Sequence, residues 1–327
     1  MPAFFMRLFS VLILSIGLFN SEIAVAQTRL RWQLENDSFQ YLPPSIRVFK
    51  TNDSLNGRPF KAFYAEINLK DPNLAVSAEV GRGSAYKLSE YFEKEEKPYI
   101  IINGGYFNRE TLQNLSLVMQ KGVQLAFNQP SVKSKMTDSF YYPTRAALGF
   151  SRSKRPFISW VFTDTVNRYP MSFEVKPIKA KGINADPSFE DLETLEHWQW
   201  WRMETAIGGG PVLVQKGKVF ITANEEQLFV NSVKELHPRT AAGYTRTGKL
   251  IFLVVEGRNK EASGASLEEL AQLFVELKCK EAINLDGGGS SAMLINGKHS
   301  IHPSDKEGER PVPSVLMIKA VAVAQIY

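Results

Sequence analysis

The feature that most constrains this chain is a strand, helix and strand read in sequence in its second half. In the strand expected at 249–256, residues 250–255 are a continuous apolar run, the pattern of a strand buried on both faces. Ser266 and Glu269 form an S-x-x-E capping box, and apolar residues recur at helical spacing after it. A second apolar strand follows at 281–286. This order predicts a βαβ unit with two parallel strands.

The same pattern occurs earlier in the chain, which indicates an internal repeat. KPYIIINGG (97–105) aligns with KEAINLDGG (280–288), and RAALGFSRS (145–153) aligns with RTAAGYTRT (239–247). In both copies a strand that ends in Gly-Arg is followed by a helix-like stretch and then by the glycine motif. In the first copy the strand is 75–82 and the helix-like stretch 87–96; in the second they are 250–258 and 266–278. We therefore predict an α/β (mixed α+β) fold, in which a mixed β-sheet is built from βαβ units with an internal pseudo-two-fold duplication.

The N-terminus has the pattern of a secretory signal. Arg7 precedes an apolar run at 8–19, and Ala24-Val25-Ala26 fits an A-x-A cleavage site. We expect residues 1–26 to be removed and residues 27–327 to form one domain, with 27–70 as a peripheral N-terminal extension. Cys279 is a lone cysteine and cannot form an internal disulfide, so an exported form must rely on its core for stability.

Composition narrows the class of function. Hydrophobic residues make up 44% of the 327 residues, which excludes a disordered chain. The 39 Lys and Arg residues exceed the 34 Asp and Glu residues by five, but they are spread along the chain. This favours an anionic ligand over nucleic acid. No Cys/His cluster with zinc-ligand spacing and no Walker loop occurs in the sequence.

Two carboxylates mark the candidate active site. Glu256 follows the first strand and Asp286 ends the second, so parallel strands would place both at the edge where α/β sheets bind ligands. The repeat gives Val80 and Asn103 as their counterparts, which predicts one asymmetric site on a symmetric frame. The pair can act on a glycosidic bond, bind Ca²⁺ or Mg²⁺, or form structural ion pairs with arginines.

Glycine turns and arginines surround these acids. Three glycine turns (104–105, 208–210 and 287–289) offer backbone N–H groups to an oxyanion or a sugar hydroxyl. Arg239 and Arg258 have the planar fork that suits phosphate. His237 is either a general acid or a structural hydrogen-bonding group. The aromatic segment 197–201 has two possible interpretations: its side chains pack in the core, or Trp200 faces outward and stacks on a sugar.

The order of several motifs resembles the phosphodiester glycosidase family. They are INGGYF, AIGGGPVLVQKGK, HPRTAAGY, LIFLVVEGR, INLDGGGSSAML and RPVPSVL, and they run from about residue 98 to the C-terminus. One position departs mildly, since Glu256 stands where the family often has Asp. The resemblance implies Asp286 and Glu256 as catalytic groups. The substrate- or phosphate-binding residues it implies are Asn103, Gly104, Gly105, Gly209, Gly210, Arg239, Thr240, Arg258, Gly287, Gly288, Gly289, Ser290 and Arg310.

The expected activity is hydrolysis of the sugar side of a sugar-1-phosphodiester in a cell-envelope or extracellular glycan. We expect no required cofactor, while leaving open a divalent cation (Ca²⁺ or Mg²⁺) near Asp286. The expected partner is a phosphorylated glycan, with no nucleic acid and no membrane span after signal cleavage, in a bacterial periplasm or outside the cell. The alternatives are a metal-dependent phosphodiesterase that cuts the P–O bond, and a non-catalytic envelope protein that binds anionic glycans.

Overall fold

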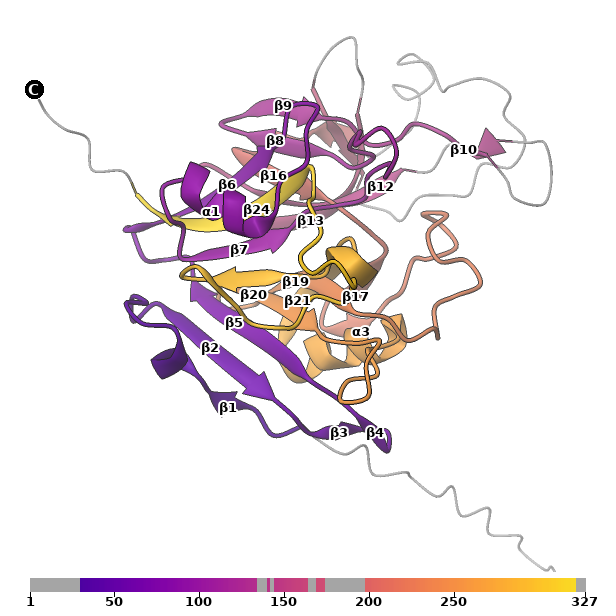
Figure 1. Cartoon of the computed structure of the whole chain (residues 1–327). Coiled ribbons are helices and arrows are strands. Elements are labelled where there is room, and N and C mark those ends of the chain that lie inside the picture. The colour runs from indigo at the N-terminus through magenta and orange to yellow at the C-terminus, as the bar shows by residue number, and fades with distance from the viewer. Residues whose placement is uncertain (1–29, 134–139, 142–143, 164–168, 174–197, 322–327) are drawn as a thin grey trace, which may run out of the picture.

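The computed structural model describes residues 30–133, 140–141, 144–163, 169–173 and 198–321. The predicted signal segment 1–26 and His197 of the aromatic segment lie outside these residues. Strands dominate the described part, and every strand pair found there is antiparallel (Figure 1).

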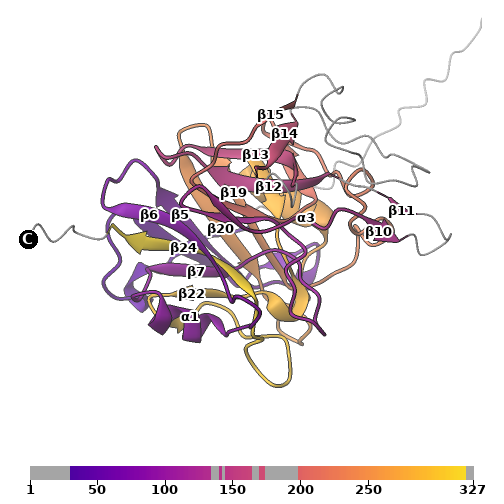
Figure 2. The same cartoon turned by 90° about the horizontal axis from the view of Figure 1, so that it is seen from above.

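Three larger sheets surround a shared core (Figures 1 and 2). The eight-stranded sheet has the order β1 (Gln33–Leu34), β2 (Ile46–Thr51), β5 (Ala62–Asn68), β20 (Lys249–Val255), β19 (Arg239–Thr245), β21 (Cys279–Asn284), β17 (Val212–Gln215) and β18 (Lys218–Val219). The seven-stranded sheet has the order β15 (Trp198–Trp200), β14 (Met171–Phe173), β13 (Pro156–Phe162), β12 (Arg145–Phe150), β16 (Thr205–Gly208), β8 (Val118–Gln120) and β9 (Val123–Ala126). The five-stranded sheet has the order β23 (Lys298–His299), β22 (Met293–Ile295), β7 (Ile100–Asn103), β24 (Ser314–Ala320) and β6 (Leu74–Val80).

The smaller elements connect these sheets. They are the helices α1 (Leu88–Lys94) and α3 (Leu267–Glu276), the 3-10 turns η1 (Asn36–Ser38) and η2 (Gly288–Ser290), and the short pairs β3 (Ser54–Leu55) with β4 (Arg58–Pro59) and β10 (Val132–Lys133) with β11 (Phe140–Tyr141). The predicted capping box is confirmed: Ser266 Oγ accepts from Glu269 N–H at 3.1 Å, and a Glu269 oxygen accepts from Ser266 N–H at 3.0 Å.

The predicted α/β fold with βαβ units is wrong. β20 and β21 do not pair with each other, because β19 lies between them and is antiparallel to both. The apolar run that suggested a parallel sheet has another cause. Leu250, Phe252 and Val254 face the core between the sheets, whereas the alternate residues pack beneath α3. A strand of an antiparallel sheet therefore reads as continuously apolar when a helix covers its second face.

The predicted pseudo-two-fold frame also needs correction, because three units share one strand order. These are β13-β12-β16-β8-β9, β20-β19-β21-β17-β18 and β6-β24-β7-β22-β23. The registers agree: Ala147 pairs with Gly208, Ala241 with Asn284, and Val315 with Asn103. By this pairing Arg145 corresponds to Arg239, as the sequence alignment had it. The counterpart of Asn103, however, is Asn284 rather than Asp286.

The units are linked in a ring. β7, β16 and β21 each leave their own sheet through a glycine turn, and each continues into a hairpin of the next sheet. Both turn residues of each hairpin have positive φ, which matches the twist of the strands; they are Lys121 and Gly122, Lys216 and Gly217, and Asn296 and Gly297. The ring brings the three glycine turns together at its centre.

Candidate active site

The glycine turns meet backbone to backbone. Asp286 N–H donates to Gly104 O at 3.2 Å, and Gly210 N–H donates to Asn284 O at 2.8 Å. A Cβ on Gly105 would overlap the Gly208 carbonyl, and a Cβ on Gly209 would overlap that of Asn284. Glycine is therefore required at these two positions, because the backbones of the glycine turns approach one another closely. The sequence prediction treated them as ligand-binding turns, and packing explains this pair without a ligand.

Asn103 holds the centre of this arrangement. Its side-chain amide donates to the Asp286 carbonyl at 2.8 Å, and its Oδ1 accepts from Thr240 Oγ1 at 2.7 Å and from Ala292 N–H at 3.1 Å. Asn103 and Thr240 are both fully buried. The structure thus brings both predicted residues to the site, where they fix the backbone that carries Asp286.

The Asp286 carboxyl is half-buried at the end of β21, where it accepts from Gly287 N–H at 2.9 Å. Burial raises its pKa from 3.8 to about 6, while a hydrogen bond from Ser290 and the charges of Arg310 and Arg109 oppose the rise. A carboxyl whose pKa lies near neutrality can exchange a proton or hold a negative charge at physiological pH.

Arg310 is fixed beside this acid. Its Nε donates to Asp305 at 2.7 Å and its Nη2 at 2.9 Å, a two-point ion pair, and its Nη1 lies 3.3 Å from Ser290 Oγ. The turn 287–289 passes over the same guanidinium, since a Cβ on Gly289 would overlap it. Ser290, Arg310 and this turn are therefore assembled around Asp286, as the sequence predicted.

Arg239 is a buried cation with 1% exposure, and its guanidinium donates to backbone carbonyls. Its Nε donates to Ala265 O and its Nη2 to Glu235 O, both at 2.9 Å, and the guanidinium lies 5.4 Å from the Phe229 ring centroid. Burial lowers its pKa from 12.5 to about 10, so it stays charged at neutral pH. A desolvated cation without a carboxylate among these contacts is suited to an anionic ligand.

Arg145 is a second buried cation that the sequence analysis treated only as a structural partner. It is 6% exposed, and its Nε has no hydrogen-bond partner. Glu226 lies near it, but the Glu226 oxygens accept from Ala146 N–H, Val212 N–H, Trp160 Nε1 and Thr222 Oγ1. Arg145 is the register counterpart of Arg239, so the alignment of 145–153 with 239–247 carried the signal that could have found it.

Tyr106 lies between these groups. Its hydroxyl donates to Gly210 O at 2.5 Å and accepts from Asn284 Nδ2 at 2.8 Å. Burial raises the pKa of Tyr106, and the charge of Asp286 adds to the rise while Arg239 and Arg145 oppose it. The charges of the acid and of both buried arginines therefore act on the Tyr106 phenol.

Glu256 follows the end of β20, and Arg258 reaches the turn 287–289, where a Cβ on Gly288 would lie 3.0 Å from its Nη2. Glu256 is 4% exposed; its oxygens accept from Asn259 Nδ2 at 3.0 Å and from His302 N–H at 3.1 Å. Arg258 is exposed and its Nη2 lies 3.3 Å from His237 Nδ1. Two strand spacings, about 10 Å, separate the ends of β20 and β21. The structure therefore brings Glu256 to the same end of the sheet as Asp286 and gives it different partners.

No group of three or more His, Cys, Asp or Glu side chains that could hold a metal ion occurs among the described residues. In that same part of the chain, no helix has the length and apolar character needed to cross a membrane.

Comparison with known proteins supports the resemblance seen in the sequence. Residues 174–319 match the family model of phosphodiester glycosidases. The bovine N-acetylglucosamine-1-phosphodiester alpha-N-acetylglucosaminidase is 36% identical over 110 residues, which are 30% of this chain and 20% of the bovine protein. A prophage-derived protein of Bacillus subtilis is 39% identical over 82 residues, which are 25% of this chain and 13% of that protein. The alignments thus span about a fifth or less of these relatives.

Solved structures show the same fold. The catalytic domain of the zebrafish N-acetylglucosamine-1-phosphodiester alpha-N-acetylglucosaminidase, auto-inhibited by its pro-peptide, has a TM-score of 0.59 at 20% identity; the match covers 89% of this chain and 88% of that one. A hypothetical protein from Synechocystis has a TM-score of 0.58 at 15% identity, over 90% of this chain and 68% of that one. Together with the motifs, the family match shows that residues 174–319 are similar to the phosphodiester glycosidases.

Proposed function

We propose that this protein hydrolyses a sugar-1-phosphodiester on its sugar side, in a glycan of the cell envelope or outside the cell. The observation that carries the proposal is the half-buried Asp286, with a pKa raised to about 6, beside Ser290 and the fixed Arg310. The family match supports the reaction class. The N-terminal signal pattern supports export, with a bacterial envelope as the proposed location.

The reaction breaks the bond between the anomeric carbon and the bridging oxygen. Water adds its hydroxyl to the sugar, and the acceptor keeps a phosphomonoester. Phosphate is a good leaving group, so the site has more need of charge stabilisation than of a strong general acid. Asp286 would act as nucleophile, base or stabilising carboxylate at the anomeric carbon. Arg239 and Arg145 would bind the departing phosphate.

Glu256 has a different proposed role. Its two oxygens hold the loop at Asn259 and the backbone of His302, so it would position the segments beside the acceptor. Arg258, which is exposed at the same edge, would contact the acceptor side of the phosphate.

Hydrolysis in ¹⁸O-labelled water tests the proposal against the alternative of a phosphodiesterase. The substrate is a small sugar-1-phosphodiester with a chromogenic acceptor, and mass spectrometry locates the label. Label in the released sugar supports C–O cleavage, whereas label in the phosphate means P–O cleavage and overturns the proposal. Tight binding with no turnover on any phosphoglycan would favour the non-catalytic alternative. Adding EDTA and then Ca²⁺ or Mg²⁺ tests for a cation near Asp286.

A further inference from the structure

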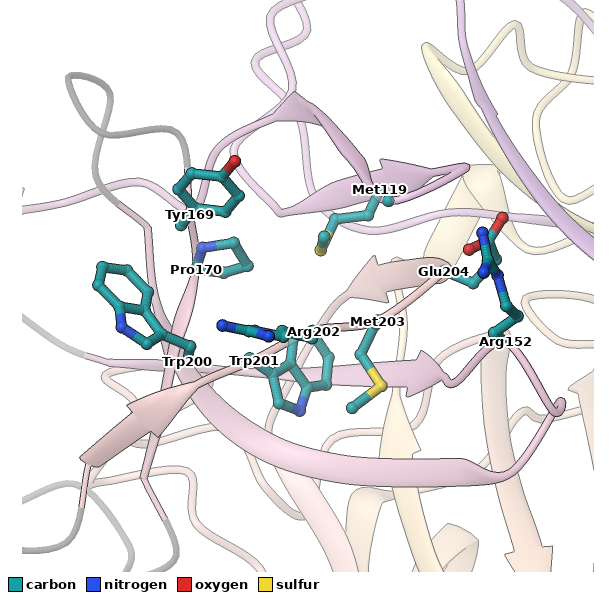
Figure 3. A pocket seen from close by; sticks show the side chains of 10 residues that line it. Met119, Arg152, Tyr169, Pro170, Trp200, Trp201, Arg202, Met203 and Glu204 are labelled. Atoms are coloured by element: carbon teal, nitrogen blue, oxygen red, sulfur yellow. The ribbon is translucent and has the colours of Figure 1, made fainter.

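The outer faces of the three sheets are covered differently. α3 packs on the eight-stranded sheet and α1 on the five-stranded sheet. On the seven-stranded sheet, the described residues that cover the corresponding face include Trp201 and Met203, and both pack against Gly149. A cavity of about 540 Å³ opens beside them (Figure 3). This volume lies within the range of small-ligand sites.

Aromatic rings form one wall of the cavity. Tyr169 is 64% exposed and Trp200 is 38% exposed, and their ring centroids lie 5.9 Å apart with the planes at 77°. Trp201 forms the floor and is buried (Figure 3). Exposed indole and phenol rings offer flat apolar faces of the kind that pack against the C–H faces of a pyranose. Large exposed aromatic groups that gather in one concavity indicate a binding surface.

Charged groups supply the polar part of the cavity. Arg202 and Arg152 are exposed, and Glu204 is half-buried. In Figure 3 the Arg202 guanidinium extends toward Trp200, while Arg152 and Glu204 lie together at the opposite end. Two arginines against one carboxylate leave a positive balance, and guanidinium groups bind phosphate or carboxylate oxygens in two-point geometry. The lining therefore fits a sugar that carries an anionic group.

We propose that this cavity, lined by Tyr169, Trp200, Trp201, Arg202, Arg152 and Glu204, is a second carbohydrate site that binds a pyranose segment of an anionic glycan. It lies at the start of β16, whose other end reaches the glycine turn at 208–210. Four strand residues span about 13 Å. A substrate polymer of several sugars would have one unit in the cavity and another at Asp286. That this polymer is also the substrate rests on the proposed function, whereas binding itself does not.

The experiment measures binding and turnover separately. Calorimetric titration uses phosphomannan, a hexose polymer with phosphodiester groups, and the same mannan without phosphate. The variants are the double substitution Trp200→Ala with Tyr169→Ala, and Arg202→Gln alone. Tyr41→Ala is the matched control, because Tyr41 is an exposed aromatic residue (87%) outside the cavity. Turnover of a small sugar-1-phosphodiester is measured for every variant.

We expect the double variant to bind phosphomannan about tenfold or more weakly, with small-substrate turnover unchanged. Arg202→Gln should weaken phosphomannan binding and leave mannan binding unchanged, and Tyr41→Ala should change neither. Unchanged affinity in both cavity variants overturns the proposal, as does equal loss in the Tyr41 control. If the double variant unfolds, Arg202→Gln and Trp200→Phe decide the matter, since Phe should retain most of the affinity. Binding lost in the variants of a protein that turns over nothing would support this site and refute the proposed function.

Discussion

The side-chain amide of Asn103 donates to the backbone carbonyl of Asp286, with 2.8 Å between Nδ2 and O. This bond joins the end of β7 in one sheet to the end of β21 in another. The candidate acid is therefore held by a residue 183 positions away in sequence, and its position depends on the packing of two units rather than on its own loop.

Asp286→Asn should abolish most activity and raise stability at pH 7. Burial holds the pKa of Asp286 near 6 in the folded protein, above its unfolded value of 3.8, so the folded state binds the proton more tightly. The free energy of unfolding therefore falls as pH rises from about 4 to 6. Asn removes this cost, and we expect a gain on the order of 2 kcal/mol at pH 7. Thermal melts at pH 4 and pH 7 with turnover assays test this; an active or less stable variant contradicts it.

Arg310→Gln should move the acidic limb of the pH–rate profile upward. The charge of Arg310 lowers the pKa of Asp286, and the variant leaves Asp305 without its two-point partner. Both changes disfavour the ionised Asp286, so a reaction that uses the carboxylate should require higher pH. The measurement is kcat/KM from pH 4 to 9. Arg246→Gln, an exposed arginine at the far end of β19, should leave the limb in place.

Arg239→Lys and Arg145→Lys should each reduce kcat/KM about 10- to 100-fold, because an ammonium cannot reproduce two-point phosphate binding. The double variant should lose less than the product of the two effects if both contact one phosphate. Steady-state kinetics and inhibition by inorganic phosphate provide the readout. Normal phosphate inhibition in both single variants would remove these arginines from the site.

Glu256→Gln should retain more activity than Asp286→Asn by at least about tenfold. Glu256 accepts two hydrogen bonds from its neighbours, and Gln can still accept one of them. We expect weaker loop order and a loss on the order of 1–3 kcal/mol in the free energy of unfolding, seen as a lower Tm. If Glu256→Gln is as inactive as Asp286→Asn while its Tm is normal, Glu256 acts in the chemistry.

Gly209→Ala should prevent folding or reduce stability by several kcal/mol, since its Cβ would overlap the Asn284 carbonyl. Gly248→Ala is the matched control: it has positive φ and open space around it, so it should cost about 1 kcal/mol. Soluble yield and urea unfolding distinguish them. Similar stability of the two variants would show that the glycine turns are not tightly packed.

Local signals were sufficient for some elements. The capping box at Ser266 predicted the start of α3, and the family motifs identified residues that meet around Asp286. The sheet could not be derived in the same way. An apolar run such as 250–255 reports burial on both faces, and burial does not distinguish a parallel neighbour from an antiparallel strand covered by a helix. The equivalence of Asn103 and Asn284 was missed because Leu285 and Asp286 separate Asn284 from its glycine turn, whereas Asn103 is followed directly by Gly104. Aligning the glycines therefore paired Asn103 with Asp286.

Arg145 shows another limit of sequence reading. Its alignment with Arg239 was visible, but the unpartnered state of its Nε was not, because the oxygens of the nearby Glu226 are occupied by donors from three other segments. Which cation remains available to a ligand is decided by tertiary contacts.

The ring of units has a consequence for synthesis. β24 pairs with β6 on one side and β7 on the other, so it fills a gap between two strands that come much earlier in the sequence. The groove between β6 and β7 therefore stays open until residues 314–320 have been synthesised. A chain truncated before residue 314 would expose two unpaired strand edges and should aggregate rather than yield a smaller working protein.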